Sequence, residues 1–303
     1  MPGADSLLTD NHMNIKVFTA VFLAIFFWGF SFVWTNQILM EDIPVFTFIF
    51  FRMFIAGTLL YLFSKFTGKL QKIEKGDYKL LFLMAFFEPF IYFIGETFGL
   101  QATNSPTLSA LIIALIPVFA LGAGVFIYKE KITWINLLGV IATIPGILLM
   151  VLNTGDMNPE YWWGIALLFL AIFGSVGYST VVKRLSSRYN SFTIATYQFV
   201  FGAILFLPCF LIFNGDYQVA SLFEWNILKP ILYLAVLCSC LSFVLYIFSI
   251  KSLGIARSSV FTSLIPAVSA VGAYIYGYET FTWQQILGIV IVILGVAITQ
   301  KQQ

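Results

Sequence analysis

Three charged residues lie deep inside long apolar stretches, and they are the side chains best placed to do chemistry there. Arg52 falls within residues 43–66, and Glu88 and Glu96 fall within residues 78–101. A charged side chain facing lipid costs about 2.5–3.5 kcal/mol or more, so each should face the protein interior and be paired. Along one helix, Glu88, Tyr92 and Glu96 have i, i+4, i+8 spacing and form one stripe. This stripe is suited to binding an ammonium group or a proton.

The depths of the three groups predict how they pair. Counted from the expected outer ends of their segments, Arg52 lies at a depth between the two carboxylates. We therefore predict structural charge pairing of Arg52 with one carboxylate, which leaves the other free. The alternative is a wholly structural charge network that holds the two segments together.

The elements that must position these groups are membrane helices. The chain is 60% apolar and 10% charged, with a mean hydropathy of +0.94, whereas soluble domains carry about 25% charged residues. A membrane-spanning helix needs about 20 apolar residues. Ten segments meet this requirement, and they leave no room for a soluble domain: about 15–37, 43–66, 78–101, 105–128, 133–152, 161–183, 191–214, 229–251, 256–278 and 282–299.

The two halves of the chain are related by an internal repeat. Residues 109–146 recur, without a gap, at residues 258–295, and such self-similarity indicates structural repeats. Five helices per repeat is an odd number, so the second repeat must enter the membrane from the opposite side. We predict an all-α membrane protein with ten transmembrane helices in two inverted five-helix repeats, residues 14–153 and 161–299. Residues 1–13 are interpreted as a vector leader.

Basic residues predict the orientation. Of the 16 lysines and arginines, 14 lie in loops on one side or in the termini, whereas Lys229 lies on the other side and Arg52 within a helix. The positive-inside rule then places both termini in the cytoplasm and the loop around Asp156 outside. We expect a multi-pass protein of a bacterial inner (plasma) membrane, with the lipid bilayer as its surroundings.

Two pairs of repeated residues have distinct interpretations. Pro117 and Pro266 lie mid-helix, where a proline removes a backbone hydrogen bond and kinks the helix, and we interpret them as gating kinks. Glu130 and Glu279 lie at the membrane boundary, and each precedes a Thr-Trp pair. There a structural role competes with a gating salt bridge. Thr282 and Gln285 form a capping-box pattern, and we expect Thr133 to cap its helix in the same way.

Other chemistry is not indicated. Cys209, Cys238 and Cys240 lie within helices and lack metal-ligand spacing. No phosphate-binding glycine loop is present, so ATP is not the expected energy source. The net charge of +2 is not pooled on one domain, and no nucleic-acid partner is expected. We predict no cofactor, no metal and no catalytic residue, because nothing supplies a nucleophile.

The repeated motifs resemble those of the EamA family, which belongs to the drug/metabolite transporter superfamily. The resemblance spans residues 15–299 and rests on Trp28-Gly29, Arg52, Gly99-Leu100-Gln101, Pro117, Glu130 with Thr133-Trp134, Leu138-Gly139 and the second copy of the doubled motif. It implies a central pocket lined by helices 1, 3, 4, 6, 8 and 9, and export or exchange of small metabolites. It also implies that helices 5 and 10 can support a homodimer. Glu88 and Glu96 are not general features of the family.

These observations together predict a secondary transporter that moves a small polar or aromatic metabolite, such as an amino acid, by alternating access, with protons as a candidate coupling ion. The alternatives are an importer of a nucleobase, vitamin or organic cation, a channel, and a membrane enzyme. The side chains expected to bind substrate are Trp28, Ser31, Glu88, Tyr92, Glu96, Tyr178, Ser242, Tyr246 and Thr262.

Overall fold

The computed structural model describes residues 4–120, 122, 133–152, 158–253, 258 and 261–299. Every regular element in these ranges is helical. In chain order they are α1 (Ala4–Leu39), α2 (Val45–Phe66), η1 (Lys75–Asp77), α3 (Tyr78–Ala85), η2 (Phe86–Ile91), α4 (Tyr92–Thr103), α5 (Pro106–Ile113), α7 (Trp134–Leu152), α8 (Pro159–Ser186), α9 (Ser191–Phe213), η3 (Val219–Phe223), α10 (Trp225–Leu232), η4 (Tyr233–Leu241), α11 (Ser242–Leu253), η5 (Phe261–Leu264), α13 (Ile265–Ile275) and α14 (Trp283–Thr299).

The described helices are those of a multi-pass membrane protein. Seven are long and apolar enough to cross a bilayer: Ile15–Leu39, Val45–Phe66, Lys75–Thr103, Trp134–Leu152, Pro159–Ser186, Ser191–Phe213 and Trp225–Ser252. Three shorter apolar helices cover Pro106–Ala120, Phe261–Ile275 and Trp283–Ile298. The first helix begins at Ala4 rather than near residue 15, because extending an existing helix avoids the cost of nucleating a new one.

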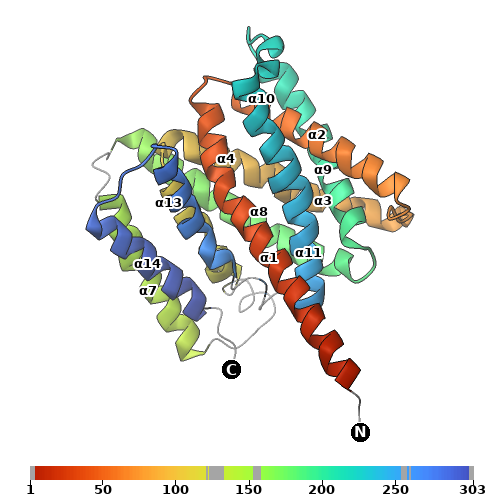
Figure 1. The fold of residues 1–303 in the computed structure, drawn as a ribbon. Helices are drawn as coiled ribbons and strands as arrows, with labels where there is room; N and C mark the ends of the chain where they lie inside the picture. The colour runs from red at the N-terminus through yellow and green to blue at the C-terminus, as the bar shows by residue number, and fades with distance from the viewer. Residues whose placement is uncertain are drawn as a thin grey trace.

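Helices from the two halves of the chain pack in pairs. Helix α2 lies along α9, and α7 lies along α14 at one edge of the bundle (Figure 1). The α7–α14 contact needs glycine, because a Cβ atom added at Gly146 would lie 2.7 Å from the Gly288 carbonyl oxygen, and one added at Gly288 would lie 2.7 Å from the Gly146 carbonyl oxygen. These two backbones therefore touch directly.

The segment that carries the two glutamates is not one regular helix. Between α3 and α4 lies the π-helical segment η2, in which Glu88 has φ −146° and ψ 112°. Pro89 provides no N–H and disfavours a helical conformation at the residue before it. The regular stripe expected from Glu88 to Glu96 therefore holds only for Tyr92 and Glu96 within α4. A second π-helical segment, η4, interrupts the corresponding stretch between α10 and α11.

Breaks also occur at the two repeated prolines. Helix α5 ends at Ile113, and a turn at residues 114–115 precedes the short helical piece that contains Pro117. Pro266 occupies the first turn of α13, directly after the 3₁₀ segment η5. Both helices are thus discontinuous at the same position of the repeat.

Local capping follows the sequence pattern. The Thr282 N–H donates to Gln285 Oε1 at 2.9 Å, and the Gln285 N–H donates to Thr282 Oγ1 at 3.3 Å. Thr133 and Asn136 exchange equivalent bonds at the start of α7. Both predicted caps are confirmed.

Glu279 caps a helix from the other half of the chain. Its carboxylate accepts from Ser105 Oγ at 2.5 Å and from the Thr107 hydroxyl, at the N-terminus of α5. Its repeat counterpart, Glu130, lies outside the described residues, as does Asp156.

Two loops from different halves are joined by a polar network, which we call the loop clasp: Asp77, Arg188 and Tyr189. Arg188 Nη1 donates to both Asp77 carboxylate oxygens at 3.0 and 2.9 Å, and Tyr189 Oη donates to Asp77 Oδ2 at 2.8 Å. The bound carboxylate raises the pKa of Arg188. Every charged group of the clasp has a partner.

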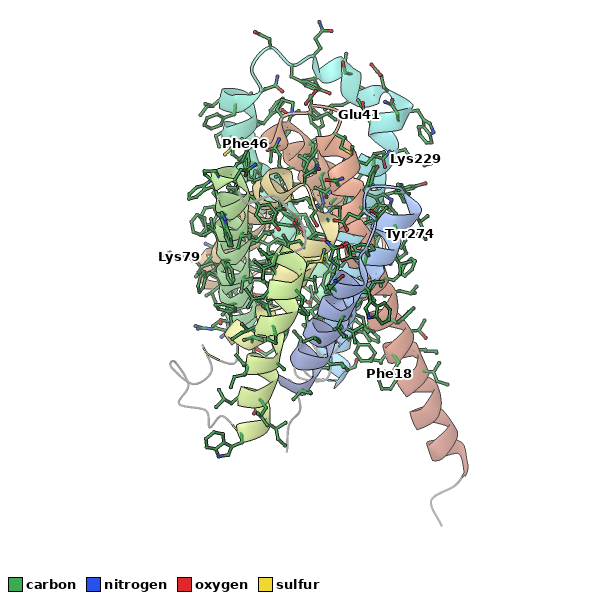
Figure 2. The ribbon with its side chains drawn as sticks, turned by 90° about the vertical axis from the view of Figure 1, so that its left-hand side faces the viewer. Phe18, Glu41, Phe46, Lys79, Lys229 and Tyr274 are labelled. Carbon is green, nitrogen blue, oxygen red and sulfur yellow. The ribbon has the colours of Figure 1, made fainter. Side chains whose placement is uncertain are left out.

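The side chains show how the ends of the bundle differ from its flanks. Glu41 and Lys229 lie toward one end, and Phe18 lies on α1 toward the other (Figure 2). Tyr274 points outward from α13 and is 65% exposed.

Candidate substrate site

Arg52 lies in the centre of the bundle, 2% exposed. Its Nε donates to Ser239 Oγ of η4 at 3.1 Å, and its Cζ lies 4.2 Å from the ring centroid of Phe93. Among the described residues, no carboxylate oxygen lies within the 4.0 Å that defines an ion pair with Arg52. The contact expected with a glutamate is therefore replaced by a hydroxyl and a ring, and the attraction to Glu96 and Glu88 acts over a longer distance.

The two carboxylates are also buried, with Glu88 6% and Glu96 4% exposed. The Ser175 hydroxyl of α8 interacts with Glu88, and the Tyr92 hydroxyl interacts with Glu96. Glu96 Oε2 has no hydrogen-bond partner among the described residues. With both carboxylates ionised, this part of the interior carries one more negative charge than Arg52 can balance.

Aromatic side chains join α1 and α11. The Trp28 ring lies edge-on to Tyr246 at 4.8 Å and to Phe243 at 5.0 Å. Trp28 Nε1 donates to the Cys238 carbonyl oxygen at 3.0 Å, which holds α1 against η4. Trp28 and Tyr246 are only partly buried.

A second polar pair, from α8 and α9, lies on the side of Glu88. Tyr178 Oη donates to Gln198 Oε1 at 3.0 Å. Both Tyr178 and Tyr246 lie within electrostatic range of Glu88. Residues from α2, η2, α4, α8, α9, η4 and α11 thus contribute to one polar cluster, which we call the central cluster: Arg52, Glu88, Tyr92, Glu96, Ser175, Tyr178, Gln198, Ser239 and Tyr246.

Two of the expected hydroxyl ligands make hydrogen bonds within their own membrane segments. Ser31 Oγ donates to the Trp28 carbonyl oxygen at 2.7 Å, and Ser242 Oγ donates to the Leu237 carbonyl oxygen at 2.7 Å. Such bonds satisfy the hydroxyl within its own helix. Thr262 lies in η5, which packs against α1.

Sequence reasoning did not select Ser175, Gln198 or Phe93 as site residues. Phe93 and Ser175 carry no signal that separates them from the many other aromatic and hydroxyl residues of the apolar segments. Gln198 did carry a sequence signal, because the pair Tyr197-Gln198 corresponds to Phe51-Arg52 at an offset of 146 residues. A position that holds a buried arginine in one repeat was a reason to examine its counterpart.

A multi-pass helical bundle with discontinuous helices and buried charged groups is an architecture found in membrane transport proteins. The chain is a member of the EamA-like transporter family, whose profile matches residues 15–152 and 162–300. The doubled match agrees with the repeat seen in the sequence. The expected family is therefore confirmed.

Relatives and a solved structure agree with this assignment. The chain is 27% identical to the uncharacterized transporter YetK of Bacillus subtilis, over 98% of this chain and 89% of that protein. It is 27% identical to a chloroplastic WAT1-related protein of Arabidopsis thaliana, over 97% of this chain and 71% of that protein. A crystal structure aligns with a TM-score of 0.69 at 15% identity, over 93% of this chain and 96% of that one, which shows a shared fold. The general function is transport.

Proposed function

We propose that the chain is a secondary transporter that moves a small metabolite across a bacterial inner membrane by alternating access. Ten membrane helices in two inverted five-helix repeats would carry this out. The paired packing of α2 with α9 and of α7 with α14 supports the two-repeat arrangement, because each pair joins corresponding helices. Inverted repeats and discontinuous helices are features of secondary transporters.

The observation that carries the proposal is that the central cluster holds two buried carboxyl groups and one basic side chain. Glu88 and Glu96 are both buried, and Arg52 is the one basic side chain placed near them among the described residues. A buried charge without a partner is strongly unfavourable. An ammonium group or a proton would remove the imbalance, so we assign the cluster to binding a substrate amine or a coupling proton.

Glu88 is the residue we assign to that exchange. Arg52 interacts more strongly with Glu96 than with Glu88, which leaves Glu88 the less compensated of the two. Its backbone leaves the helical conformation next to Pro89, so the carboxyl group sits at a break between α3 and α4. Such a break allows the local backbone to adjust as the two sides open in turn.

Alternating access needs elements that can bend, and the breaks before Pro117 and Pro266 supply them. The two breaks lie at the same position of the repeat, one directly after α5 and the other directly before α13. Opening one side would bend one of these helices and relax the other. Both termini would be cytoplasmic, and labelling a cysteine at position 156 in intact cells tests this; labelling only after permeabilisation would contradict the orientation.

Counterflow in proteoliposomes tests the function. The ligand that gives the largest thermal shift, from amino acids, purines, vitamins and aromatic cations, is loaded inside vesicles, and radiolabelled ligand is added outside. We expect saturable, transient accumulation, which a carrier produces and a channel or an enzyme does not. Uptake that is linear in ligand concentration, without accumulation, would refute the proposal.

A further inference from the structure

A groove lies on the outside of the bundle where α3 packs against α9. Its volume is about 510 Å³, and it is lined by Tyr78, Lys79, Phe82, Leu83 and Phe201. Tyr78, Phe82 and Leu83 are each between 40% and 45% exposed, so no other part of the described chain covers this face of α3. An apolar surface of this kind on a multi-pass membrane protein meets lipid, and lipid tails are as apolar as a leucine side chain.

Aromatic rings from the two helices border the groove. The ring centroids of Phe82 and Phe201 lie 6.1 Å apart, and those of Tyr78 and Tyr197 lie 6.2 Å apart. Both pairs are edge-on, and on each helix the two residues are four positions apart, which places them on one face. The ring contacts therefore fix the spacing of α3 and α9 along the groove.

One end of the groove is basic. Lys79 is exposed at the edge of the bundle (Figure 2), and no carboxylate oxygen lies within 4.0 Å of its Nζ among the described residues. Residues 65–79 contain five lysines and two acidic residues, and Arg188 already binds one of these acids, Asp77. Lysines beside a membrane helix attract anionic lipid headgroups. The groove thus combines an apolar length with a cationic end, which complements an anionic phospholipid.

We propose that this groove binds one anionic phospholipid of the surrounding bilayer. The headgroup phosphate would accept a hydrogen bond from Lys79 Nζ, and an acyl chain would lie on Phe82, Leu83 and Phe201. A zwitterionic lipid offers the same chain, but its headgroup carries a cation that offsets the attraction to lysine, so charge is the selective feature. The inference concerns a surface separate from the central cluster and does not rest on the proposed function.

Three probes separate the headgroup charge from the acyl chains. Dioleoylphosphatidylglycerol is anionic, dioleoylphosphatidylcholine has the same chains and no net charge, and glycerophosphoglycerol is the anionic headgroup without chains. Each is titrated into the purified full-length chain in a non-ionic detergent, and native mass spectrometry gives the apparent Kd of the first molecule bound. We expect phosphatidylglycerol to bind about fivefold more tightly than phosphatidylcholine, the factor that one lysine near an anionic headgroup provides. Glycerophosphoglycerol should not bind at the same concentrations.

The decisive variant is Lys79→Gln, which removes the charge from an exposed side chain. It should weaken phosphatidylglycerol about fivefold and leave phosphatidylcholine unchanged. The matched control is Lys16→Gln, which removes the same charge from an exposed position of α1, outside the groove, and should change neither lipid. Phe82→Ala removes a ring from the apolar part of the groove and should weaken both lipids by the same factor. This variant keeps the inference testable if Lys79→Gln does not fold.

Three results would overturn the inference. The first is phosphatidylcholine binding to the wild type as tightly as phosphatidylglycerol. The second is Lys16→Gln losing as much affinity for phosphatidylglycerol as Lys79→Gln. The third is glycerophosphoglycerol binding as tightly as the whole lipid, which would indicate a site for a free phosphate ester without an acyl chain. These measurements use no transported substrate, so their outcome is separate from that of the counterflow experiment.

Discussion

The loop clasp and the central cluster use the same residue types with opposite results. In the clasp, Asp77 accepts three hydrogen bonds of 2.8–3.0 Å from Arg188 and Tyr189. In the central cluster, Arg52 has no carboxylate oxygen within 4.0 Å among the described residues, and Glu96 Oε2 has no partner there. An acid, an arginine and a tyrosine are present in both places, and only one set is satisfied.

The difference separates groups that stabilise the fold from groups that can bind a ligand. The clasp is extended by other bonds between the same loops, with Asn190 Nδ2 donating to the Lys69 carbonyl oxygen at 2.7 Å and the Gln71 N–H donating to Thr193 Oγ1 at 2.9 Å. Groups with complete partners stabilise one arrangement of the chain. Groups that are buried without complete partners are unfavourable until a ligand or a proton completes them. The cluster, not the clasp, is therefore where we expect substrate to act.

The largest effect is expected when the central cluster loses Arg52, its one nearby cation among the described residues. Arg52→Leu removes the positive charge that acts on the two buried carboxylates. Because no described carboxylate oxygen lies within 4.0 Å of Arg52, the loss of stability should be smaller than the about 3–5 kcal/mol that breaking a direct buried pair costs. Unfolding in detergent should show this loss, and Arg52→Leu combined with Glu96→Leu should recover most of it. An Arg52→Leu protein as stable as the wild type would show that Arg52 does not compensate the carboxylates.

Glu279 is intermediate between the two regions, because it is hydrogen-bonded to Ser105 and Thr107 yet mostly buried. Burial raises the pKa of Glu279 despite those bonds. The folded state therefore binds a proton more tightly than the unfolded state. This stabilisation is fully present below the usual pKa of about 4.5 and is lost as the pH rises through the folded-state pKa.

The corresponding variant is Glu279→Gln, which cannot titrate. We expect the Tm of the wild type, measured relative to Glu279→Gln, to fall as the pH rises from about 4.5 towards neutrality. The amide oxygen can still accept from Ser105, and the Thr107 hydroxyl can rotate to accept from the amide NH2, so the variant should fold normally. A Tm difference that grows in favour of the wild type with rising pH would mean that the hydrogen bonds outweigh burial.

The smallest effect is expected at the clasp. Arg188 is about half exposed on its side chain, and solvent weakens ion pairs of this kind. Asp77→Asn should lower the Tm slightly, because Tyr189 and Arg188 keep a weaker acceptor, and it should leave transport unchanged. Glu74→Gln is the matched control, since its contact with Arg188 is 3.8 Å long and exposed. Loss of transport in Asp77→Asn would place the clasp within the transport cycle.

Much of the fold could be predicted from sequence because membrane helices are encoded locally. Apart from the start of α1 and the segment ends that lie outside the described residues, the apolar segments start and end within a few residues of the observed helices, and the Thr282–Gln285 cap forms as its spacing indicates. The break at Glu88 was signalled by Pro89, although the π-helical geometry was not. The partner of Arg52 could not be predicted, because depth along two helices does not determine their rotation. That rotation turns Arg52 towards Ser239 and Phe93.

The most direct test of the central claim compares Glu88→Gln with Asp77→Asn, measuring unfolding and flux on the same preparations. Glu88→Gln keeps the shape of the side chain and removes its charge. The account predicts a folded Glu88→Gln protein that has lost cation- or proton-dependent flux, beside an Asp77→Asn protein that is less stable and transports normally. Flux by Glu88→Gln with the wild-type rate and the wild-type pH dependence would show that the buried carboxylate is structural and would contradict the account.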